Sequence, residues 1–174
     1  MLKKSIFKDK RLYLSAPIEY NTESNWREEV KKVLTKKFGF NVFDPSQDPK
    51  QQWWSVLREA RETKDYEKIA TIAKLFVRKD LAMVDRADLV IAYVPHKVPT
   101  TGVVHEVINS NNCKKPTLLV SNCDDISYIP VWYYGFIATE FMFPNWKALF
   151  KYLKEVEDGK HKDNDRWSFI YGDI

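Results

Sequence analysis

One stretch of the chain, Asp88-Leu89-Val90-Ile91-Ala92-Tyr93-Val94, decides the fold class. Six consecutive hydrophobic residues follow its aspartate, and the run has the length of a strand. Strict alternation is typical of a strand with one face in water. An unbroken hydrophobic run is instead typical of a central strand in a parallel sheet, which is buried on both faces. The stretch therefore predicts a parallel sheet covered by helices on both sides.

Further strands and helices alternate on either side of this stretch. Hydrophobic segments that predict strands lie at residues 11–15, 40–43 and 117–121, with an edge strand at residues 137–143. Helical spacing of hydrophobic residues predicts helices at residues 24–38, 50–63, 65–84, 103–111 and from Trp146 onward. This alternation indicates a doubly wound α/β fold of the Rossmann or flavodoxin-like type, with a mostly parallel five-stranded sheet and helices on both faces. No linker or repeat interrupts it, so we expect a single domain over residues 1–174.

Local signals predict where two of these helices begin and one ends. Asn25 and Glu28 have the spacing of a capping box at the start of the first helix. Gly39 predicts a left-handed residue that ends this helix. Asn145 predicts the N-cap of the last helix, which carries Trp146.

The charge balance excludes several classes of function. The chain has 28 basic and 24 acidic residues, a net charge of +4, and no basic run long enough to follow a phosphate backbone. We therefore expect no nucleic-acid partner. No hydrophobic run reaches the length of a membrane span, and the lysine-rich start lacks the hydrophobic segment of a signal peptide. We expect a cytoplasmic protein with no membrane partner.

No cofactor or metal is predicted. Cys113 and Cys123 match no metal or redox spacing, so we expect buried or unreactive thiols in a reducing compartment. His96, His105 and His161 lack metal-ligand spacing and are expected to be solvated or core histidines. The chain also has no glycine-rich loop that would hold phosphates.

Aromatic residues are abundant, at 14% of the chain. Such a content fits either a core and an interface between subunits rich in rings, or a pocket that stacks planar ligands. Composition alone favours the first interpretation.

A site in this fold is expected beyond the carboxyl ends of the strands, in the loops after Leu14, Phe43, Val94 and Val120. Asp80 is one candidate residue, because it lies on the hydrophobic stripe of the helix at residues 65–84. A carboxylate on a core-facing stripe is costly unless it is paired or used. The stripe alone leaves open whether Asp80 bonds to a neighbouring backbone group or arginine, or serves a site.

Glu106 is the second candidate. It is expected in the first turn of the helix that follows the strongest strand and Gly102, at the edge of the strand-end crevice. The positive end of the helix dipole would favour its ionised form, as a nucleophile or base requires. Its position alone favours the alternative, an ordinary capping acid.

Three stretches resemble the nucleoside 2-deoxyribosyltransferase family, which includes the related deoxynucleoside monophosphate N-glycosidases. They are residues 12–18 (LYLSAPI), residues 80–92 (DLAMVDRADLVIA), and residues 101–107 (TGVVHEV) followed by residues 114–120 (KKPTLLV). The aromatic C-terminal tail is a weaker match to the tail that reaches the active site in the bacterial transferases.

The resemblance implies a role for individual residues. It implies that Glu106 is the nucleophile that attacks the anomeric carbon, that Asp80 is the acid that helps protonate the leaving base, and that Tyr13 orients the nucleophile. Gly102 would keep its loop close to the sugar. Together with the strand-end loops, the resemblance implies substrate contacts by Ser15, Pro17, Asp44, Gln47, Thr100, Gly102, Trp132 and Tyr171.

Three positions depart from the pattern of one or both branches of the family. Thr100 stands where the transferases have an aspartate for the 5′-hydroxyl and the glycosidases have a serine for a 5′-phosphate. Pro17 matches the transferases, where the glycosidases carry a serine. Pro130 replaces a polar residue in the segment 129–135, which a neighbouring subunit lends to the site in the family.

The resemblance implies a double displacement through a covalent glycosyl-Glu106 ester, with a nucleoside or nucleotide and a free nucleobase as partners. Transfer of 2-deoxyribose between bases is the first hypothesis, and hydrolysis of nucleoside 5′-monophosphates is the second. The third is a non-catalytic nucleotide-binding module. A homo-oligomer with shared active sites is also implied, with a dimer as the minimal unit.

Overall fold

The computed structural model describes residues 5–19 and 25–172 of the chain. Within them, five parallel strands form one sheet in the order β2-β1-β3-β4-β5. The strands are β1 (Arg11–Ser15), β2 (Asn41–Phe43), β3 (Leu89–Tyr93), β4 (Thr117–Val120) and β5 (Met142–Phe143). All five residues of β3 are buried, which confirms the central parallel strand. This strand order is the flavodoxin-like form of the doubly wound fold.

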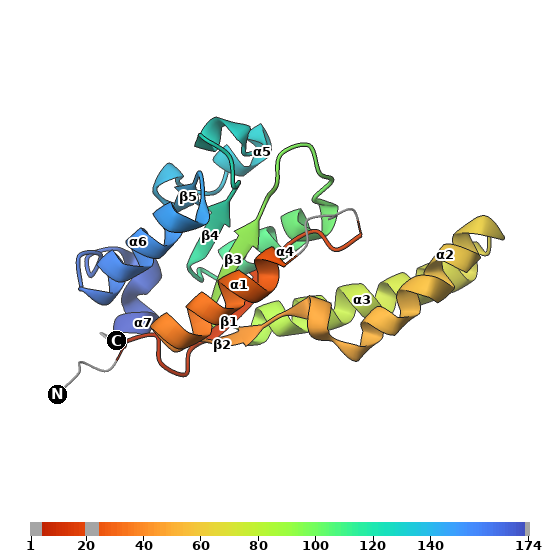
Figure 1. Cartoon of the computed structure of the whole chain (residues 1–174), viewed down its shortest axis with the longest axis horizontal. Helices are drawn as coiled ribbons and strands as arrows, with labels where there is room; N and C mark the ends of the chain where they lie inside the picture. Colours follow the sequence, from red (N-terminus) through yellow and green to blue (C-terminus); the bar gives the residue numbers. More distant parts are fainter. Residues whose placement is uncertain (1–4, 20–24, 173–174) are drawn as a thin grey trace.

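Helices cover both faces of the sheet (Figure 1). The main helices are α1 (Trp26–Val33), α2 (Trp54–Glu62), α3 (Tyr66–Arg86), α4 (Thr101–Asn112) and α6 (Trp146–Glu157), with short helices α5 (Val131–Tyr134) and α7 (Ser168–Tyr171). Alternate side chains of β1 point to opposite faces of the sheet. Leu12 and Leu14 face the larger core with α1 and α6, whereas Tyr13 faces α3 and packs with Val84.

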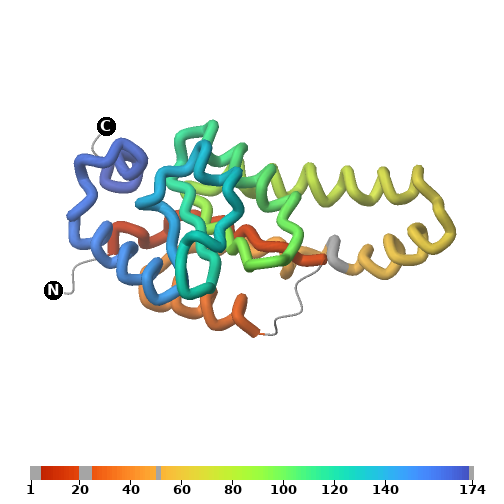
Figure 2. The backbone as a smooth tube through the Cα atoms, turned by 90° about the horizontal axis from the view of Figure 1, so that it is seen from above, coloured from red at the N-terminus to blue at the C-terminus, as the bar shows by residue number. Residues whose placement is uncertain are grey.

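A helical hairpin formed by α2 and α3 extends from the sheet (Figures 1 and 2). At 21 residues, α3 is about 31 Å long. A five-residue strand such as β3 spans only about 17 Å. One end of α3 therefore covers the sheet, and its other end pairs with α2 beyond the carboxyl edge of the strands.

Most of the expected elements are present, but several ends differ. Gly39 ends the first helix with φ +83°, as predicted, after a π-helical turn at Leu34–Phe38. Asn145 caps α6 by accepting a hydrogen bond from Ala148 N at 3.0 Å, also as predicted. The capping box is wrong: Asn25 precedes α1 with φ 70° and makes no side-chain cap bond, whereas a capping residue needs extended backbone.

The edge strand expected at residues 137–143 is reduced to β5. The amides of Ile137 and Phe141 already donate to Tyr133 O and Ala138 O, so this backbone bonds locally and cannot join the sheet. A 3₁₀ turn at Thr139–Phe141 takes the place of the strand. Cys113 and Cys123 are free thiols, and Cys113 is exposed rather than buried.

Candidate active site

A cavity of about 460 Å³ opens at the carboxyl ends of β1 and β3, at the point where strand order reverses. The loop after β1 and the start of α4 form one wall, and α2 and α3 form the other. Doubly wound folds bind ligands at this switch point. The volume lies in the range of small-molecule sites.

Glu106 is held at the base of this cavity by two hydroxyl groups of β1. Tyr13 Oη donates a hydrogen bond to Glu106 Oε1 at 2.8 Å, and Ser15 Oγ donates to Glu106 Oε2. Tyr13 and Ser15 are two residues apart on one strand, so both side chains point toward the face that α4 covers. The carboxylate is thereby fixed in orientation, with one donor on each oxygen.

Electrostatics keep Tyr13 a hydrogen-bond donor. Burial, followed by the nearby charges of Glu106 and Asp80, raises the pKa of Tyr13 well above its ordinary value of 10.0. The phenol therefore remains protonated at any working pH. A hydrogen bond donated to a carboxylate stabilises its ionised form, which a nucleophile requires.

Glu106 lies in the second turn of α4 and not in the first, because the helix begins at Thr101. The interpretation of Glu106 as a capping acid is therefore wrong. The helix dipole acts mainly within the first turn. Hydrogen bonds from Tyr13 and Ser15 stabilise its charge at this place in the helix.

Asp80 enters the same cavity from α3, and its charge contributes to the raised pKa of Tyr13. The hydrophobic stripe of α3 around it was expected to face the core. Instead Phe76, Val77 and Leu81 line the cavity, and the residues of α3 that are fully buried are Ile72 and Val84. Asp80 thus lies on a stripe that faces the cavity, where its side chain is half-buried.

Arg27 is a residue of the site that the sequence did not reveal. It donates to Leu14 O, to Ala16 O and to Asp44 Oδ1, at 3.4, 3.1 and 3.1 Å. These bonds hold the carboxyl end of β1 next to Ser15. Arginines on the polar side of an amphipathic helix are usually solvated, so no sequence signal distinguished this one.

Residues 9–122 match the protein family described as nucleoside 2-deoxyribosyltransferase like. The chain belongs to this family. The match contains Tyr13, Asp80 and Glu106, whereas α5, α6 and α7 lie outside it.

One solved structure similar to this deoxyribosyltransferase-like chain is a 2-deoxyribosyltransferase from the psychrotolerant bacterium Bacillus psychrosaccharolyticus. The two chains are 22% identical over 82% of this chain and 95% of that one, with a TM-score of 0.53. At this identity the similarity concerns the fold. No curated protein sequence matches the chain.

Several predicted substrate contacts of the deoxyribosyltransferase-like chain do line the cavity, namely Pro17, Thr100 and Gly102. A Cβ atom added at Gly102 would meet nothing within 4 Å, so this position opens into free space that a ligand could occupy. Ser15 instead contacts Glu106.

Other predicted contacts lie elsewhere in the chain. Asp44 is buried and pairs with Arg27, and Gln47 is exposed beside Glu28. Trp132 lies exposed on α5 and is not part of the cavity lining. Tyr171 Oη donates to Val156 O of α6, so the aromatic tail packs on the body of the same chain.

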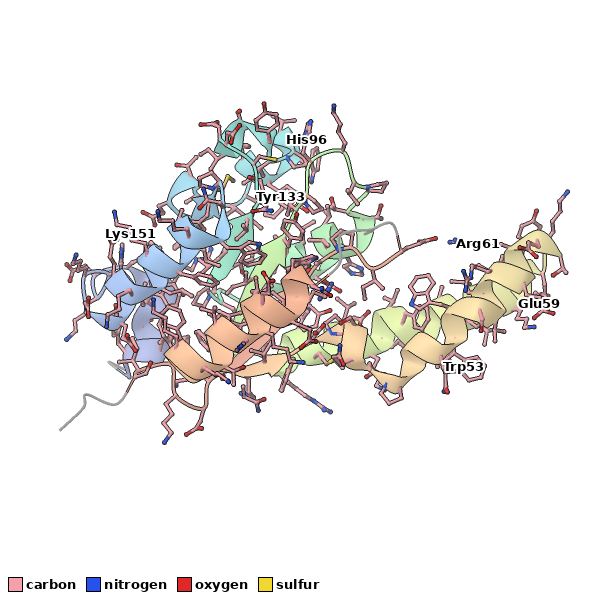
Figure 3. The ribbon with its side chains drawn as sticks, in the orientation of Figure 1. Trp53, Glu59, Arg61, His96, Tyr133 and Lys151 are labelled. Atoms are coloured by element: carbon pink, nitrogen blue, oxygen red, sulfur yellow. The ribbon has the colours of Figure 1, made fainter. Side chains whose placement is uncertain are left out.

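The hairpin wall also carries residues to which sequence reasoning assigned no role. Arg61 of α2 forms an ion pair with Glu19 of the loop after β1, across the cavity (Figure 3 labels Arg61 on the hairpin). Trp54 and Phe76 form a ring pair with centroids 5.1 Å apart. Exposed His105 lines the cavity as well.

Metal and membrane features are absent from the part of the chain that the structure describes. Within residues 5–19 and 25–172, no three His, Cys, Asp or Glu side chains are grouped to bind a metal ion. The helices of these ranges are too short or too polar to cross a membrane.

Proposed function

We propose that the protein cleaves the N-glycosidic bond of 2′-deoxynucleosides and transfers the deoxyribosyl group to another nucleobase. One observation carries this proposal: the Glu106 carboxylate is fixed between the hydroxyls of Tyr13 and Ser15 in a cavity that Asp80 also enters. A binding module has no need of a carboxylate oriented in this way. Membership in the deoxyribosyltransferase-like family supports the same conclusion.

In the first step, Glu106 attacks the anomeric carbon of the bound nucleoside. The carbon–nitrogen bond breaks through an oxocarbenium-like transition state, and its electron pair leaves with the base. Asp80 in its neutral form donates a proton to the departing base. The products of this step are a glycosyl ester on Glu106 and a free base.

In the second step, a nitrogen of an incoming base attacks the anomeric carbon of the ester. Asp80, now ionised, accepts the proton that this nitrogen loses, and the ester bond breaks to regenerate the Glu106 carboxylate. Tyr13 and Ser15 hold the carboxylate oxygens throughout, so little reorganisation accompanies either displacement.

The charges of the cavity favour a neutral nucleoside. Glu19 and Glu106 contribute carboxylates to its described lining, and Asp80 contributes a third when it is ionised, whereas Arg61 contributes a guanidinium that is already paired with Glu19. A 5′-phosphate would meet repulsion in such a site. Hydrolysis of 5′-monophosphates remains the second candidate, because the neutral side chain of Thr100 in the cavity wall admits a phosphate that an aspartate would repel.

A base-exchange assay tests the proposal. The protein is incubated with a 2′-deoxynucleoside and a different free base, and the products are separated by chromatography. We expect a new deoxynucleoside whose formation requires the added base. Release of free sugar alone would instead support a hydrolase, sugar phosphate released from a monophosphate would support the second candidate, and binding without any product would support a non-catalytic module.

We further propose that the protein is a homo-oligomer, with a dimer as the minimal unit. Val131 and Trp132 of α5 are 85% and 71% exposed, and Tyr128 is exposed beside them. Clustered exposed hydrophobic side chains are typical of interaction surfaces. Light scattering at micromolar concentration should give a mass of at least twice 20.6 kDa, and a monomer alone would contradict the proposal.

A further inference from the structure

The cavity extends beyond the residues that the proposed reaction uses. Its lining on α3 begins at Leu81 and Asp80, near the sheet, and continues along the helix to Ile69, near the hairpin turn. The segment of α3 from Ile69 to Asp80 is about 16 Å long. A purine has two fused rings and is much shorter than this segment. A base held at Asp80 therefore occupies only one end of the cavity.

The lining positions of α3 lie on one face of the helix. They are Ile69, Ala73, Phe76, Val77, Asp80 and Leu81. Spacings of three and four residues bring such side chains to a single face. Among these lining residues of α3, Asp80 is the one with an ionisable side chain. The face is therefore hydrophobic from Ile69 up to the residue that contacts the base.

The hairpin and the loop after β1 enclose this part of the cavity. Trp54 and Leu57 of α2 lie on its wall, and the rings of Trp54 and Phe76 are half-buried with centroids 5.1 Å apart. The ion pair of Arg61 with Glu19 lies at the far end, near the turn of the hairpin (Figure 3). The cavity is thus charged at both ends and hydrophobic between them.

This hydrophobic section is better suited to a hydrocarbon group than to a peptide segment. Between Asp80 and the Arg61–Glu19 pair, the described part of the hairpin lining carries no charged side chain. A peptide would bring backbone N–H and C=O groups, which need partners when they are buried. A hydrocarbon group needs none. Val77 lines the section and is 47% exposed, so hydrophobic surface remains for such a group to cover.

We propose that this section is a subsite for a hydrophobic substituent on the nucleobase. It is called the hairpin subsite here and is formed by Trp54, Leu57, Ile69, Ala73, Phe76 and Val77. The proposal rests on the proposed function, in which Glu106 marks the sugar and Asp80 marks the base. The substituent extends from the edge of the base opposite the sugar. The substrate class is therefore a nucleoside whose base carries an alkyl or aryl group.

The first test measures binding of two nucleosides by calorimetry. 2′-Deoxyadenosine is compared with its derivative that carries a benzyl group on the exocyclic nitrogen. We expect the benzyl derivative to bind about tenfold more tightly, because its ring is removed from water in the hairpin subsite. Equal or weaker binding would overturn the proposal, including the case in which a segment of a second copy fills the section.

A series of linear alkyl groups on the same nitrogen measures the length of the subsite. The affinity should rise about threefold for each added methylene group. The rise should stop when the chain reaches the Arg61–Glu19 pair, because further methylene groups would meet charged side chains. An affinity that does not depend on chain length would overturn the proposal. So would one that rises without limit, since it would indicate non-specific binding.

Two variants of α3 locate the subsite. Ala73→Phe places a ring in the middle of the section, so the benzyl derivative should lose its advantage over 2′-deoxyadenosine. Ala70→Phe is the matched control, because it makes the same substitution on the same helix at an exposed position outside the cavity lining. The control should keep the wild-type ratio of the two dissociation constants. Equal changes in both variants, or none in either, would overturn the proposal.

A further variant serves if Ala73→Phe does not fold. Ile69→Ser replaces a hydrophobic side chain at the far end of the section with a polar one. It should reduce the affinity gained from the longest alkyl chains and leave the gain from the shortest ones unchanged. A uniform reduction over the whole series would contradict the assigned position of the subsite.

These measurements separate the subsite from the proposed function, because binding does not require turnover. Tighter binding of the benzyl derivative without any base exchange would support the hairpin subsite and contradict the transferase. Base exchange that shows no preference for substituted bases, in a protein that binds both nucleosides equally, would overturn the subsite alone. A protein that binds neither nucleoside would overturn both proposals.

Discussion

The two walls of the cavity are built differently. The sheet wall presents Tyr13 and Ser15 from a strand that pairs on both sides, and both side chains are fully buried. The hairpin wall presents residues of α2 and α3, where Leu75 and Val77 remain 50% and 47% exposed. A reacting carboxylate needs a fixed position, whereas side chains that only contact the base can move without stopping the reaction. We therefore expect the sheet wall to hold the nucleophile of the chemical step. We expect the hairpin wall, apart from Asp80, to control substrate affinity and choice of base.

The largest expected effect lies on the sheet wall. Glu106→Ala should abolish turnover and leave the fold intact, because loss of a covalent nucleophile removes the chemical step. Steady-state base exchange measures the rate, and circular dichroism checks the fold. A variant that keeps more than about a tenth of the wild-type rate, a deficit of only ~1.4 kcal/mol, would contradict the role of Glu106.

A smaller effect of a different kind is expected on the hairpin wall. Phe76→Ala removes a ring that lines the cavity and pairs with Trp54. Such ring contacts contribute about 0.5–1.5 kcal/mol, so KM should rise up to about tenfold with a much smaller change in kcat. Tyr66→Ala, on an exposed residue of the same hairpin outside the cavity lining, is the control and should change neither constant. If kcat fell as far as KM rose, the division of labour between the walls would be wrong.

The smallest effect concerns stability at alkaline pH. The pKa of Tyr133 is about 12 in the folded protein against 10.0 for an ordinary tyrosine. Because the pKa of Tyr133 is higher in the folded state, the folded protein holds the phenol proton more tightly than the unfolded chain does. The stability that this proton binding contributes is complete below pH 10 and is lost as the pH rises through 12. Between pH 8 and pH 11 the wild type should lose about 1.4 kcal/mol more unfolding free energy than Tyr133→Phe. Urea titrations at both pH values measure this difference, and parallel losses would show that Tyr133 is not buried in solution.

The sequence predicted the sheet wall better than the hairpin wall. Unbroken hydrophobic runs such as residues 89–94 identify buried parallel strands, and strand ends identify where a site forms. The resemblance then implied roles for Asp80 and Glu106, which line one cavity, and for Tyr13, which donates a hydrogen bond to Glu106. These features follow from local pattern and topology.

The hairpin wall and the supporting residues could not be predicted in this way. A hydrophobic stripe on a helix has the same pattern whether it faces a core or a cavity, so the stripe of α3 was expected in the core. Arg27 acts through a partner distant in sequence, Asp44, and its residue type alone gives no sign of this. The aromatic tail likewise gave no sign that Trp167 would be buried against Phe7 and Tyr152.

The proposed activity depends on the register of β1 in the sheet, because side chains alternate between the two faces of a strand. Tyr13 pairs with Val90 of β3, and its hydroxyl and that of Ser15 reach Glu106 because residues two apart share a face. Moving β1 by one residue would send both hydroxyls into the opposite layer and bring Leu12 and Leu14 against the carboxylate. Insertions within or just before this strand are therefore far less tolerable than insertions in the α2–α3 turn. Activities measured for a library of such insertions would therefore show which positions must keep the register of β1, without any structural measurement.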